Sequence, residues 1–306
     1  CRRQKVLTKQ IHWGVPQGSI LATLLFKIFI NDLPHQIQYS QTDLYADDCT
    51  LTAVGNTLTE IETNLNNDLK NIETRCQINK MKINPSKSTC MILATNQKRR
   101  TLPNDNLTLY ISNEKLTNVS THKLLGVIID CELSWKGHAD HIIKKINNNI
   151  FVFKKNKTLL TKTTRQLFCT AFILPHIHYC CNIWGHCLET HKIAINRLLK
   201  QCARLILNKN ISYPSHELFS TLKWLTLENK VQFETAVITY KSLNHLAPAY
   251  LTNCLTHSAN TSLRSNSNGN LQLPTVHKEI FRKAFSYSSS KIWNSLSTNT
   301  KPLGDV

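Results

Sequence analysis

The sequence predicts an α+β protein, in which a β-hairpin with helices is followed by a mostly α-helical region. Over residues 1–131, short runs typical of strands alternate with apolar positions at helical spacing. After Trp135, the apolar positions keep a helical spacing nearly to the end of the chain. A length of 306 residues allows about two domains, and a hydrophobic fraction of 41% excludes a disordered basic tail.

Two N-terminal helices can be placed from their capping residues. A loop over residues 14–19 is followed by a predicted helix over residues 20–30, with Ser19 as its N-cap. Thr57 and Glu60 form a capping-box pattern at the start of a second helix. The apolar face of that second helix consists of Leu58, Ile61, Leu65, Leu69, Ile72 and Cys76.

Short strands are predicted next, over residues 89–93, 107–111 and 124–129, the last with Gly126 inside it. The helices after them are predicted from the stripe Ile142, Ile143, Ile146, Ile150 and Phe153, and over residues 163–173, 193–207 and 225–246. Residues 257–270 are rich in Ser and Asn and are predicted to be a loop. The aromatic residues after this loop are expected to pack back as a small cap.

Asp47 and Asp48 are candidate catalytic and metal-binding residues. They lie between two predicted strands, over residues 44–46 and 49–54, at the length of a tight hairpin turn. Adjacent carboxylates repel each other, and a divalent cation relieves that repulsion. Mg²⁺ prefers carboxylate oxygens and keeps positions open for phosphate. A purely structural turn is the alternative, because Asp is common in turns.

The loop and the Asp pair together resemble reverse transcriptases, specifically their palm. The loop reads Gly-Val-Pro-Gln-Gly-Ser, and the turn reads Tyr-Ala-Asp-Asp. Residues 81–89 look like the next palm motif, and residues 124–128 resemble the hairpin that grips the primer end. Segments similar to the region after the palm in jockey-like non-LTR retrotransposons (LINEs) lie at residues 175–180, 184–185, 246–251, 263–265 and 293–294.

This resemblance implies RNA-templated DNA synthesis, with two Mg²⁺ ions as cofactors. The implied partners are an RNA template, a DNA primer and deoxynucleoside triphosphates. The implied organisation is a partial palm with a primer-grip-like segment over residues 1–131, a helical thumb over residues 132–210, and a C-terminal helical extension over residues 211–306.

The resemblance also implies a role for each motif residue. Asp47 would bind metal directly, and Asp48 would be a weaker ligand or shape the turn. Gln17 and Gly18 would lie beside the template and the nascent base pair, and Leu125 and Gly126 would form the primer grip.

Two further implied substrate residues have structural alternatives. Tyr45 is implied to face the substrate, but an aromatic strand residue in the core is an equal alternative. Lys87 is implied to lie near the triphosphate, and a solvated loop lysine is the alternative.

The sequence departs from the family pattern at its start. Reverse transcriptases have a third palm carboxylate upstream of the loop, whereas residues 1–13 contain neither Asp nor Glu. The chain also begins with Cys1, so we expect an upstream segment to be missing from it. Metal placement supplies much of the transition-state stabilisation, so we expect the chain by itself to be inactive. We also expect the flank of the Asp hairpin to be an unpaired, apolar sheet edge.

Positive charge is the main compositional feature. The chain has 37 Lys and Arg against 19 Asp and Glu, a net charge of +18. Nucleic acid and anionic membranes are the commonest partners of such charge, and a solvated surface is the alternative. The candidate contacts to a nucleic-acid backbone, on the implied thumb, are Lys144, Lys145, Lys154, Lys155 and Arg165.

The apolar stretches, the cysteines and the histidines indicate which partners, which cellular compartment and which metal sites to expect. The longest apolar stretch, residues 20–30, is too short to span a bilayer and contains Lys27, so no membrane partner is expected. Eleven cysteines without a signal peptide favour reduced thiols inside a cell, with nucleus and cytoplasm both open. The Cys and His residues between His176 and His191 fit no ordinary zinc spacing, so packing is expected there, with zinc as the alternative.

Two functional interpretations remain open at this point. The first is a reverse transcriptase fragment of a non-LTR retrotransposon. The second is a catalytically inert nucleic-acid-binding remnant or a thumb module that a host gene has taken over. The oligomeric state is open in both.

Overall fold

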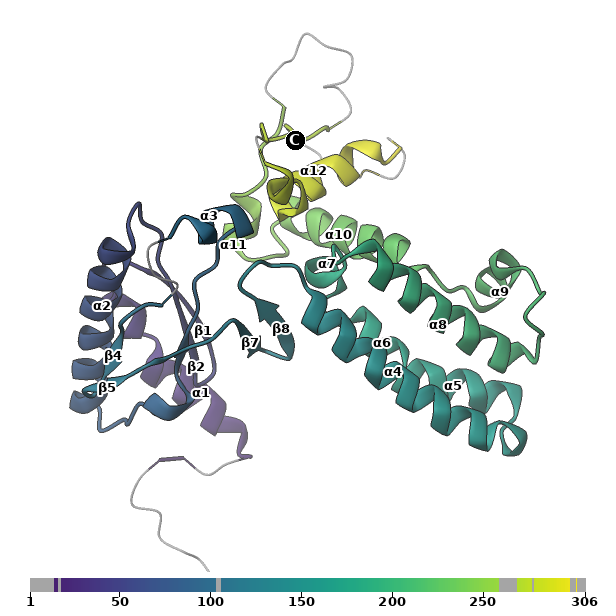
Figure 1. Ribbon diagram of the computed structural model, residues 1–306, viewed down its shortest axis with the longest axis horizontal. Helices are drawn as coiled ribbons and strands as arrows, with labels where there is room; N and C mark the ends of the chain where they lie inside the picture. Colours follow the sequence, from purple (N-terminus) through teal and green to yellow (C-terminus); the bar gives the residue numbers. More distant parts are fainter. Residues whose placement is uncertain are drawn as a thin grey trace, which may run out of the picture. The chain divides into compact units, whose positions relative to one another are not determined.

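The computed structural model describes residues 14–15, 18–102, 106–258, 269–276, 278–297 and 301 (Figure 1). The chain divides into two units, residues 1–120 and residues 121–306, each with its own hydrophobic core. The first unit mixes helices with short strands, and the second unit is mainly helical. This composition agrees with the predicted α+β class.

Both predicted N-terminal helices and their caps are confirmed. Helix α1 spans Ile20–Ile30, and the Ser19 hydroxyl accepts the Ala22 N–H at 3.2 Å. Helix α2 spans Leu58–Ile78, and the Thr57 hydroxyl accepts the Glu60 N–H at 3.2 Å. The Glu60 carboxylate accepts the N–H of Asn56 and not that of Thr57, so the capping box is formed one residue earlier than the pattern predicts.

The Asp hairpin consists of β1 (Gln41–Tyr45) and β2 (Asp48–Thr52), which pair antiparallel. Tyr45 and Asp48 form the pair that closes the turn, so the turn residues are Ala46 and Asp47. The predicted turn at Asp47 and Asp48 is therefore wrong by one residue. The reason lies in the backbone, because Ala46 takes a φ of 53° and turns the chain before Asp47.

The remaining elements of the first unit are short. They are the 3₁₀ turns η1 (Leu33–Gln36) and η2 (Pro85–Lys87), helix α3 (Asn96–Arg100), and strands β3 (Thr89–Cys90), β4 (Tyr110–Ile111), β5 (Glu114–Lys115) and β6 (Thr117–Asn118). Strands β3 and β6 pair in parallel, and β4 and β5 pair antiparallel.

The predicted strands over residues 89–93 and 107–111 are much shorter in the structure. Side chains of α2 take the place of a neighbouring strand at residues 108–110. Glu62 accepts the Thr108 N–H at 2.6 Å, and Asn66 accepts the Tyr110 N–H at 3.1 Å. These backbone groups are satisfied without a ladder, so only two residues pair as a strand.

The flank of the Asp hairpin is only partly as expected. Among the strands that the structure describes, β1 and β2 pair only with each other, which leaves their outer edges unpaired. The exposed side chains of the hairpin are mostly polar, with Tyr45 as the large apolar exception. Exposed apolar side chains lie instead along α1, at Ile20, Leu21, Leu24, Leu25 and Ile28.

The second unit begins with a hairpin of β7 (Thr121–Leu124) and β8 (Val127–Asp130). The predicted continuous strand over residues 124–129 is wrong, because Leu125 and Gly126 both have positive φ and reverse the chain. The structure does confirm the hairpin that the family resemblance implied for this segment.

A helical bundle comes after this hairpin, and in it α4 and α8 run side by side (Figure 1). Its helices are α4 (Lys136–Asn156), α5 (Lys162–Phe172), α6 (Leu174–His178), α7 (Cys181–Trp184), α8 (Glu189–Leu207) and α9 (Ser215–Leu222), with the 3₁₀ turn η3 (Lys157–Leu159) between α4 and α5. The predicted stripe of α4 is confirmed, with Ile142, Ile146, Ile150 and Phe153 buried and Ile143 partly buried.

The C-terminal elements pack against α10 (Leu227–Leu243) or against one another. They are α11 (Ala249–Thr252), the 3₁₀ turn η5 (Glu279–Lys283) and α12 (Phe285–Ser295). Trp293 is buried against Leu255 and Leu271, and Phe285 packs beside it, as predicted for the cap. Phe281 is instead 57% exposed, so only part of the predicted aromatic cap forms. Most of the predicted 257–270 loop lies outside the described residues.

Within the described residues, no helix combines the length and the apolar character that crossing a membrane requires.

Candidate active site and nucleic-acid interface

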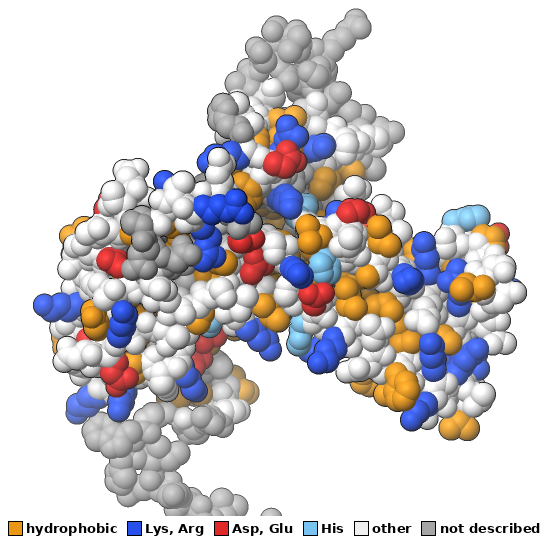
Figure 2. Space-filling model, in the orientation of Figure 1, with side chains coloured by type: hydrophobic (Ala, Val, Ile, Leu, Met, Phe, Trp, Pro, Cys, Tyr) orange, Lys and Arg blue, Asp and Glu red, His pale blue; other side chains and the backbone are white. Residues whose placement is uncertain are grey.

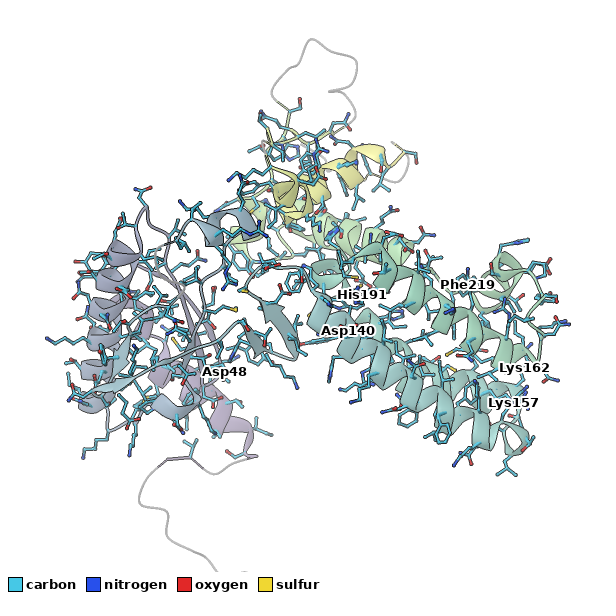
Figure 3. The ribbon with its side chains drawn as sticks, viewed as in Figure 1. Asp48, Asp140, Lys157, Lys162, His191 and Phe219 are labelled. Carbon is cyan, nitrogen blue, oxygen red and sulfur yellow. The ribbon has the colours of Figure 1, made fainter. Side chains whose placement is uncertain are left out.

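The turn of the β1–β2 hairpin presents Asp47 and Asp48 to solvent, and Figure 3 labels Asp48 on it. Asp47 lies within the turn, and Asp48 is the first residue of β2. Within the described part of the chain, no ion pair neutralises either carboxylate. The turn therefore holds two neighbouring negative charges, which is the oxygen donor chemistry that Mg²⁺ prefers.

The two carboxylates form only part of a metal-binding set. The described residues contain no group of three or more His, Cys, Asp or Glu side chains that could hold a metal ion. Asp47 and Asp48 fit a divalent cation as two ligands, and further ligands must come from water, substrate or other polypeptide.

A buried carboxylate that the motif analysis missed holds the segment leading into β1. Asp68 on α2 is fully buried and accepts the N–H groups of Gln38, Tyr39 and Ser40 at 2.9–3.4 Å. It also accepts the Ser40 hydroxyl at 2.7 Å. One sequence signal could have revealed it, because Asp68 interrupts the buried stripe of α2 next to Leu69.

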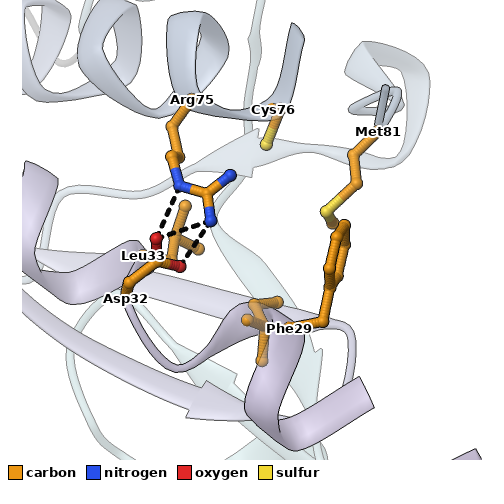
Figure 4. A pocket seen from close by; sticks show the side chains of 7 residues that line it. Phe29, Asp32, Leu33, Arg75, Cys76 and Met81 are labelled. Atoms are coloured by element: carbon orange, nitrogen blue, oxygen red, sulfur yellow. Dashed lines mark hydrogen bonds and ion pairs between the residues drawn. The ribbon is translucent and has the colours of Figure 1, made fainter. Parts of the chain in front are cut away.

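An ion pair ties the end of α1 to α2 (Figure 4). The Arg75 guanidinium donates to both oxygens of Asp32, at 2.5–2.9 Å. Leu44 and Leu51 of the hairpin pack with Ile30, Leu33 and Ile72 in the same core cluster. The hairpin is thus fixed by α1 and α2 on its apolar side, with its turn left free to meet a ligand.

The other predicted residues of the first unit differ in their surroundings. Gln17 lies outside the described residues. Gly18 has a φ of 82°, and an added Cβ would meet only open space. The positive φ therefore explains why a glycine occupies this position. Tyr45 is 66% exposed, so the alternative of a core aromatic is wrong within the described residues. Lys87 ends η2 and is exposed.

Tyr179 holds the primer-grip-like turn in place. Leu125 and Gly126 form the turn of the β7–β8 hairpin, and the Tyr179 hydroxyl donates to the Leu125 carbonyl at 2.6 Å. A Cβ on Gly126 would lie 3.4 Å from the Tyr179 ring. The backbone of the turn is therefore held against the segment between α6 and α7, an anchor that the sequence analysis did not identify.

Most of the positive charge belongs to the second unit. Residues 121–306 contain 23 Lys and Arg against 9 Asp and Glu, which gives +14 of the total +18. Figure 2 shows basic and apolar side chains spread over the face formed by the helical bundle, with few acidic ones. This distribution suits a polyanion whose backbone runs along the bundle.

The residues predicted to contact a nucleic-acid backbone differ in whether their side chains are free to contact a ligand. Lys144, Lys145, Lys154 and Lys155 on α4 are all exposed. The Lys155 ammonium also lies 4.6 Å from the centre of the Phe151 ring. The Arg165 Nε donates to the Lys157 carbonyl at 3.1 Å, so Arg165 has a structural task between η3 and α5.

Asp140, the one acidic side chain of α4, is already paired. Its carboxylate lies 3.0 Å from His191 Nε2 on α8, and Figure 3 labels both residues on the facing helices. The exposed lysines of α4 are therefore not neutralised by an acid of their own helix.

The segment between His176 and His191 packs into the core of the second unit. Cys181, Trp184 and Cys187 are 0–3% exposed. Burial raises the pKa of the Cys181 and Cys187 thiols to about 11, so both stay protonated near neutral pH. The Trp184 indole N–H donates to the Tyr179 carbonyl at 2.8 Å.

Sequence similarity to known proteins covers most of the first unit and extends beyond it. The family described as "Reverse transcriptase (RNA-dependent DNA polymerase)" matches residues 3–129. The chain is 26% identical over 202 residues to a probable RNA-directed DNA polymerase from transposon X-element of Drosophila melanogaster, a match that covers 63% of this chain and 21% of that protein.

Two further relatives come from similar elements. One is a probable RNA-directed DNA polymerase from transposon BS of Drosophila melanogaster, 24% identical over 73% of this chain and 25% of its own length. The other is the RNA-directed DNA polymerase from mobile element jockey of Drosophila funebris, 26% identical over 65% of this chain and 22% of its own length. The chain thus spans about a fifth to a quarter of these relatives. No solved structure matches it.

Proposed function

We propose that this chain, a relative of the jockey-like non-LTR retrotransposon reverse transcriptases, is the part of an RNA-directed DNA polymerase that carries the Asp-Asp turn. The observation that carries this proposal is the unpaired, exposed pair Asp47 and Asp48 at the tip of a firmly supported hairpin. The match of residues 3–129 to the reverse transcriptase family supports it.

In this proposal the hairpin positions the metal-binding carboxylates. When bound, two Mg²⁺ ions supply Lewis-acid stabilisation of the attacking oxygen, the transferred phosphate and the leaving pyrophosphate. Asp47 holds metal directly, and Asp48 is a second, weaker ligand. The Asp68 anchor holds the segment that leads into β1, and the Asp32–Arg75 pair joins the helices that pack against the hairpin, which favours carboxylates that are positioned before substrate arrives.

The other residues of the first unit contact the substrates in this proposal. The backbone at Gly18, together with Gln17, lies beside the template and nascent base pair. Tyr45 offers an exposed aromatic face next to the carboxylates, and Lys87 offers a cation to the triphosphate. The substrates are deoxynucleoside triphosphates, an RNA template and a DNA primer.

The second unit holds the duplex in this proposal. The β7–β8 turn at Leu125 and Gly126 contacts the primer end, and the exposed lysines of α4 contact phosphates without reading sequence. We assign residues 1–131 to a partial palm, residues 132–210 to a thumb and residues 211–306 to a C-terminal extension.

Primer extension on poly(rA)·oligo(dT) with Mg²⁺ tests this function. In the complete open reading frame that contains these residues, we expect incorporation of dTTP that Asp47→Ala abolishes. Asp43→Ala is the matched control, because Asp43 is an exposed carboxylate on β1 of the same hairpin. Full incorporation by the Asp47→Ala protein would contradict the proposed function.

The chain of 306 residues by itself is expected to be nearly inactive in the same assay. The described residues bring no third metal-binding side chain to Asp47 and Asp48. Incomplete metal placement removes most transition-state stabilisation, so incorporation should fall by orders of magnitude. Robust incorporation by this chain, lost in Asp47→Ala, would support the function and overturn the expected inactivity.

A further inference from the structure

Helices α4 and α5 of the second unit lie side by side and run antiparallel (Figure 1). Their direction follows from contacts in which the residue numbers rise along α4 and fall along α5. These contacts join Asn149 to Phe172, Phe153 to Phe168, and Lys157 to Arg165. The side of this pair that is turned away from the core is a surface made by two neighbouring helices, which we call the outer α4–α5 face.

Large apolar side chains are exposed on the outer α4–α5 face. Val152 on α4 is 47% exposed, and Leu167 and Phe172 on α5 are 65% and 55% exposed. Val152 lies one turn from Asn149, which bonds the Phe172 carbonyl, so Val152 is on the side of α4 next to α5. Leu167 lies two residues, or about 200° around the helix, from the buried Cys169, so it points away from the core.

The segment that carries this face has only positive charge. Residues 141–188 contain seven Lys and Arg and no Asp or Glu. Lys145 and Lys155 on α4 lie seven residues before and three residues after Val152, and both are exposed. Apolar side chains that are flanked by cations complement a ligand whose apolar side chains are flanked by anions.

We propose that the outer α4–α5 face docks an amphipathic, acidic helix of a partner protein. The apolar side of that helix packs on Val152, Leu167 and Phe172, and its Asp or Glu residues pair with Lys145 and Lys155. Helix α5 has 11 residues, or about 16 Å, which matches about three turns of a docked helix. This binding goes beyond the proposed polymerase function and does not depend on it.

The same observations favour a protein helix over a nucleic acid or a second copy of the chain. A nucleic-acid backbone presents phosphates and sugars, which gain nothing from the exposed Val152, Leu167 and Phe172. A second copy would bring the same cations to the face, because its second unit has the same charge of +14. Like charges that meet across an interface disfavour association.

Selection from a phage-displayed library of random peptides tests the proposal. Each peptide is long enough for about four helical turns, and the target is the full chain. Val152→Gln/Leu167→Gln removes two apolar contacts at exposed helix positions and keeps the net charge, so counter-selection on this variant discards peptides that bind elsewhere. We expect the retained peptides to have apolar residues at three- and four-residue intervals, with Asp or Glu beside them. An absence of retained peptides, or retained peptides without acidic residues, would overturn the proposal.

Fluorescence anisotropy of a retained peptide measures the contribution of the face. The affinity should fall by about tenfold or more in Val152→Gln/Leu167→Gln. Ile193→Gln/Leu246→Gln is the matched control, because these aliphatic side chains are 62% and 68% exposed outside the face, and it should bind as the wild-type chain does. Thermal melts followed by circular dichroism should show both double variants folded. An equal loss of affinity in both would contradict a defined docking face.

The charge of the partner is tested separately. Lys155→Gln should weaken the binding of the retained peptide a few-fold, and Lys241→Gln, at an exposed lysine of α10, should leave it unchanged. A peptide in which Asn and Gln replace Asp and Glu should bind the wild-type and Lys155→Gln chains equally. If Lys155→Gln weakens both peptides to the same extent, an acidic partner is excluded.

Two other ligands separate the classes of partner. We expect Val152→Gln/Leu167→Gln to bind a short RNA–DNA duplex and vesicles containing phosphatidylserine as the wild-type chain does. A loss of duplex binding in this variant would assign the face to nucleic acid, and a loss of vesicle binding would assign it to a membrane, and either result overturns the proposal. Peptide binding by a chain that binds no duplex would count against the proposed function and leave this docking face standing.

Discussion

At the scale of single residues, polar side chains that bond the backbone fix the geometry of the two hairpins. The Asp68 carboxylate accepts three N–H groups and one hydroxyl of residues 38–40, and in this way determines where β1 begins. His138 and Tyr179 do the same for the β7–β8 hairpin, through Ile128 and Leu125. Asp68 and His138 belong to no recognisable motif, and Tyr179 lies in the family-like segment 175–180 without its role being evident there, because all three roles depend on contacts that are distant in sequence.

Asp68→Ala tests the anchor of the Asp hairpin. The substitution removes a fully buried acceptor and leaves three N–H groups and one hydroxyl without it, so we expect it to lower the free energy of unfolding by about 2–4 kcal/mol. Asp43→Ala, at an exposed position of the same hairpin, should change it by less than about 0.5 kcal/mol. Urea unfolding of the two variants measures both values, and equal effects would contradict the anchoring role.

The buried His138 should make the stability of the folded chain depend on pH. Burial, followed by the charges of His141 and Lys145, lowers the pKa of His138 from 6.5 to about 4 in the folded chain. The unfolded chain then binds more protons between these two pH values, so stability is present above pH 6.5 and is lost as the pH falls toward 4.

We expect His138 to account for about 2–3 kcal/mol of lost stability between pH 7 and pH 4. Urea unfolding at several pH values should show a flatter profile for His138→Gln than for the wild-type chain. His216→Gln, at an exposed histidine of α9, should keep the wild-type profile. Parallel profiles of the wild-type and His138→Gln chains would rule this contribution out.

At the scale of elements, the helices could be predicted from the sequence and most strands could not. The predicted boundaries of α1 and α5 and the predicted start of α2 lie within about one residue of the structure, because capping residues and apolar spacing are local signals. The strand at residues 107–111 shrank, because Glu62 and Asn66 of α2 bond its backbone. Such pairing between distant residues leaves no periodic signal.

The exact turn positions of the two hairpins could not be predicted from the sequence either. Asp47 and Asp48 could be identified as a pair from the motif, but the positive φ of Ala46 shifts the turn by one residue. At residues 124–129, the apolar run predicts a strand, while the positive φ of Leu125 and Gly126 makes a turn. Backbone conformations of this kind are uncommon for residues that carry a Cβ, and composition does not reveal them.

The β7–β8 turn should depend on Tyr179. Tyr179→Phe removes the hydrogen bond to the Leu125 carbonyl and keeps the ring that covers Gly126, so we expect a loss of about 1 kcal/mol of stability. Hydrogen exchange should become faster for the amides of β7 and β8 and stay unchanged in α8. An unchanged exchange rate in the hairpin would show that other contacts hold the turn.

At the scale of the whole molecule, the two units differ in charge and in their similarity to known proteins. The reverse transcriptase family matches residues 3–129, and the second unit carries most of the positive charge. The carboxylate pair thus lies in one unit and most of the positive charge in the other. The family match and the charge could both be predicted from the sequence, whereas the exposed apolar face of α4 and α5 required the structure.

Charge reversal on α4 tests whether the second unit provides the duplex-binding surface. Lys144→Glu/Lys155→Glu should reduce the salt slope of RNA–DNA duplex binding by two or more, with a steep loss of affinity. Lys70→Glu/Lys82→Glu changes two exposed lysines of the first unit by the same charge. A similar loss in both double variants would show a non-specific effect of net charge and contradict a defined surface.

Paramagnetic NMR of the chain with Mn²⁺ is the most direct test of the proposed divalent-metal site at Asp47 and Asp48. We expect substoichiometric Mn²⁺ to broaden the amide signals of residues 45–49 selectively, and excess Mg²⁺ to reverse the broadening. Asp47→Ala/Asp48→Ala should abolish the effect, and Asp43→Ala should preserve it. Broadening that is absent from this turn, or unchanged in the double variant, would contradict the claim.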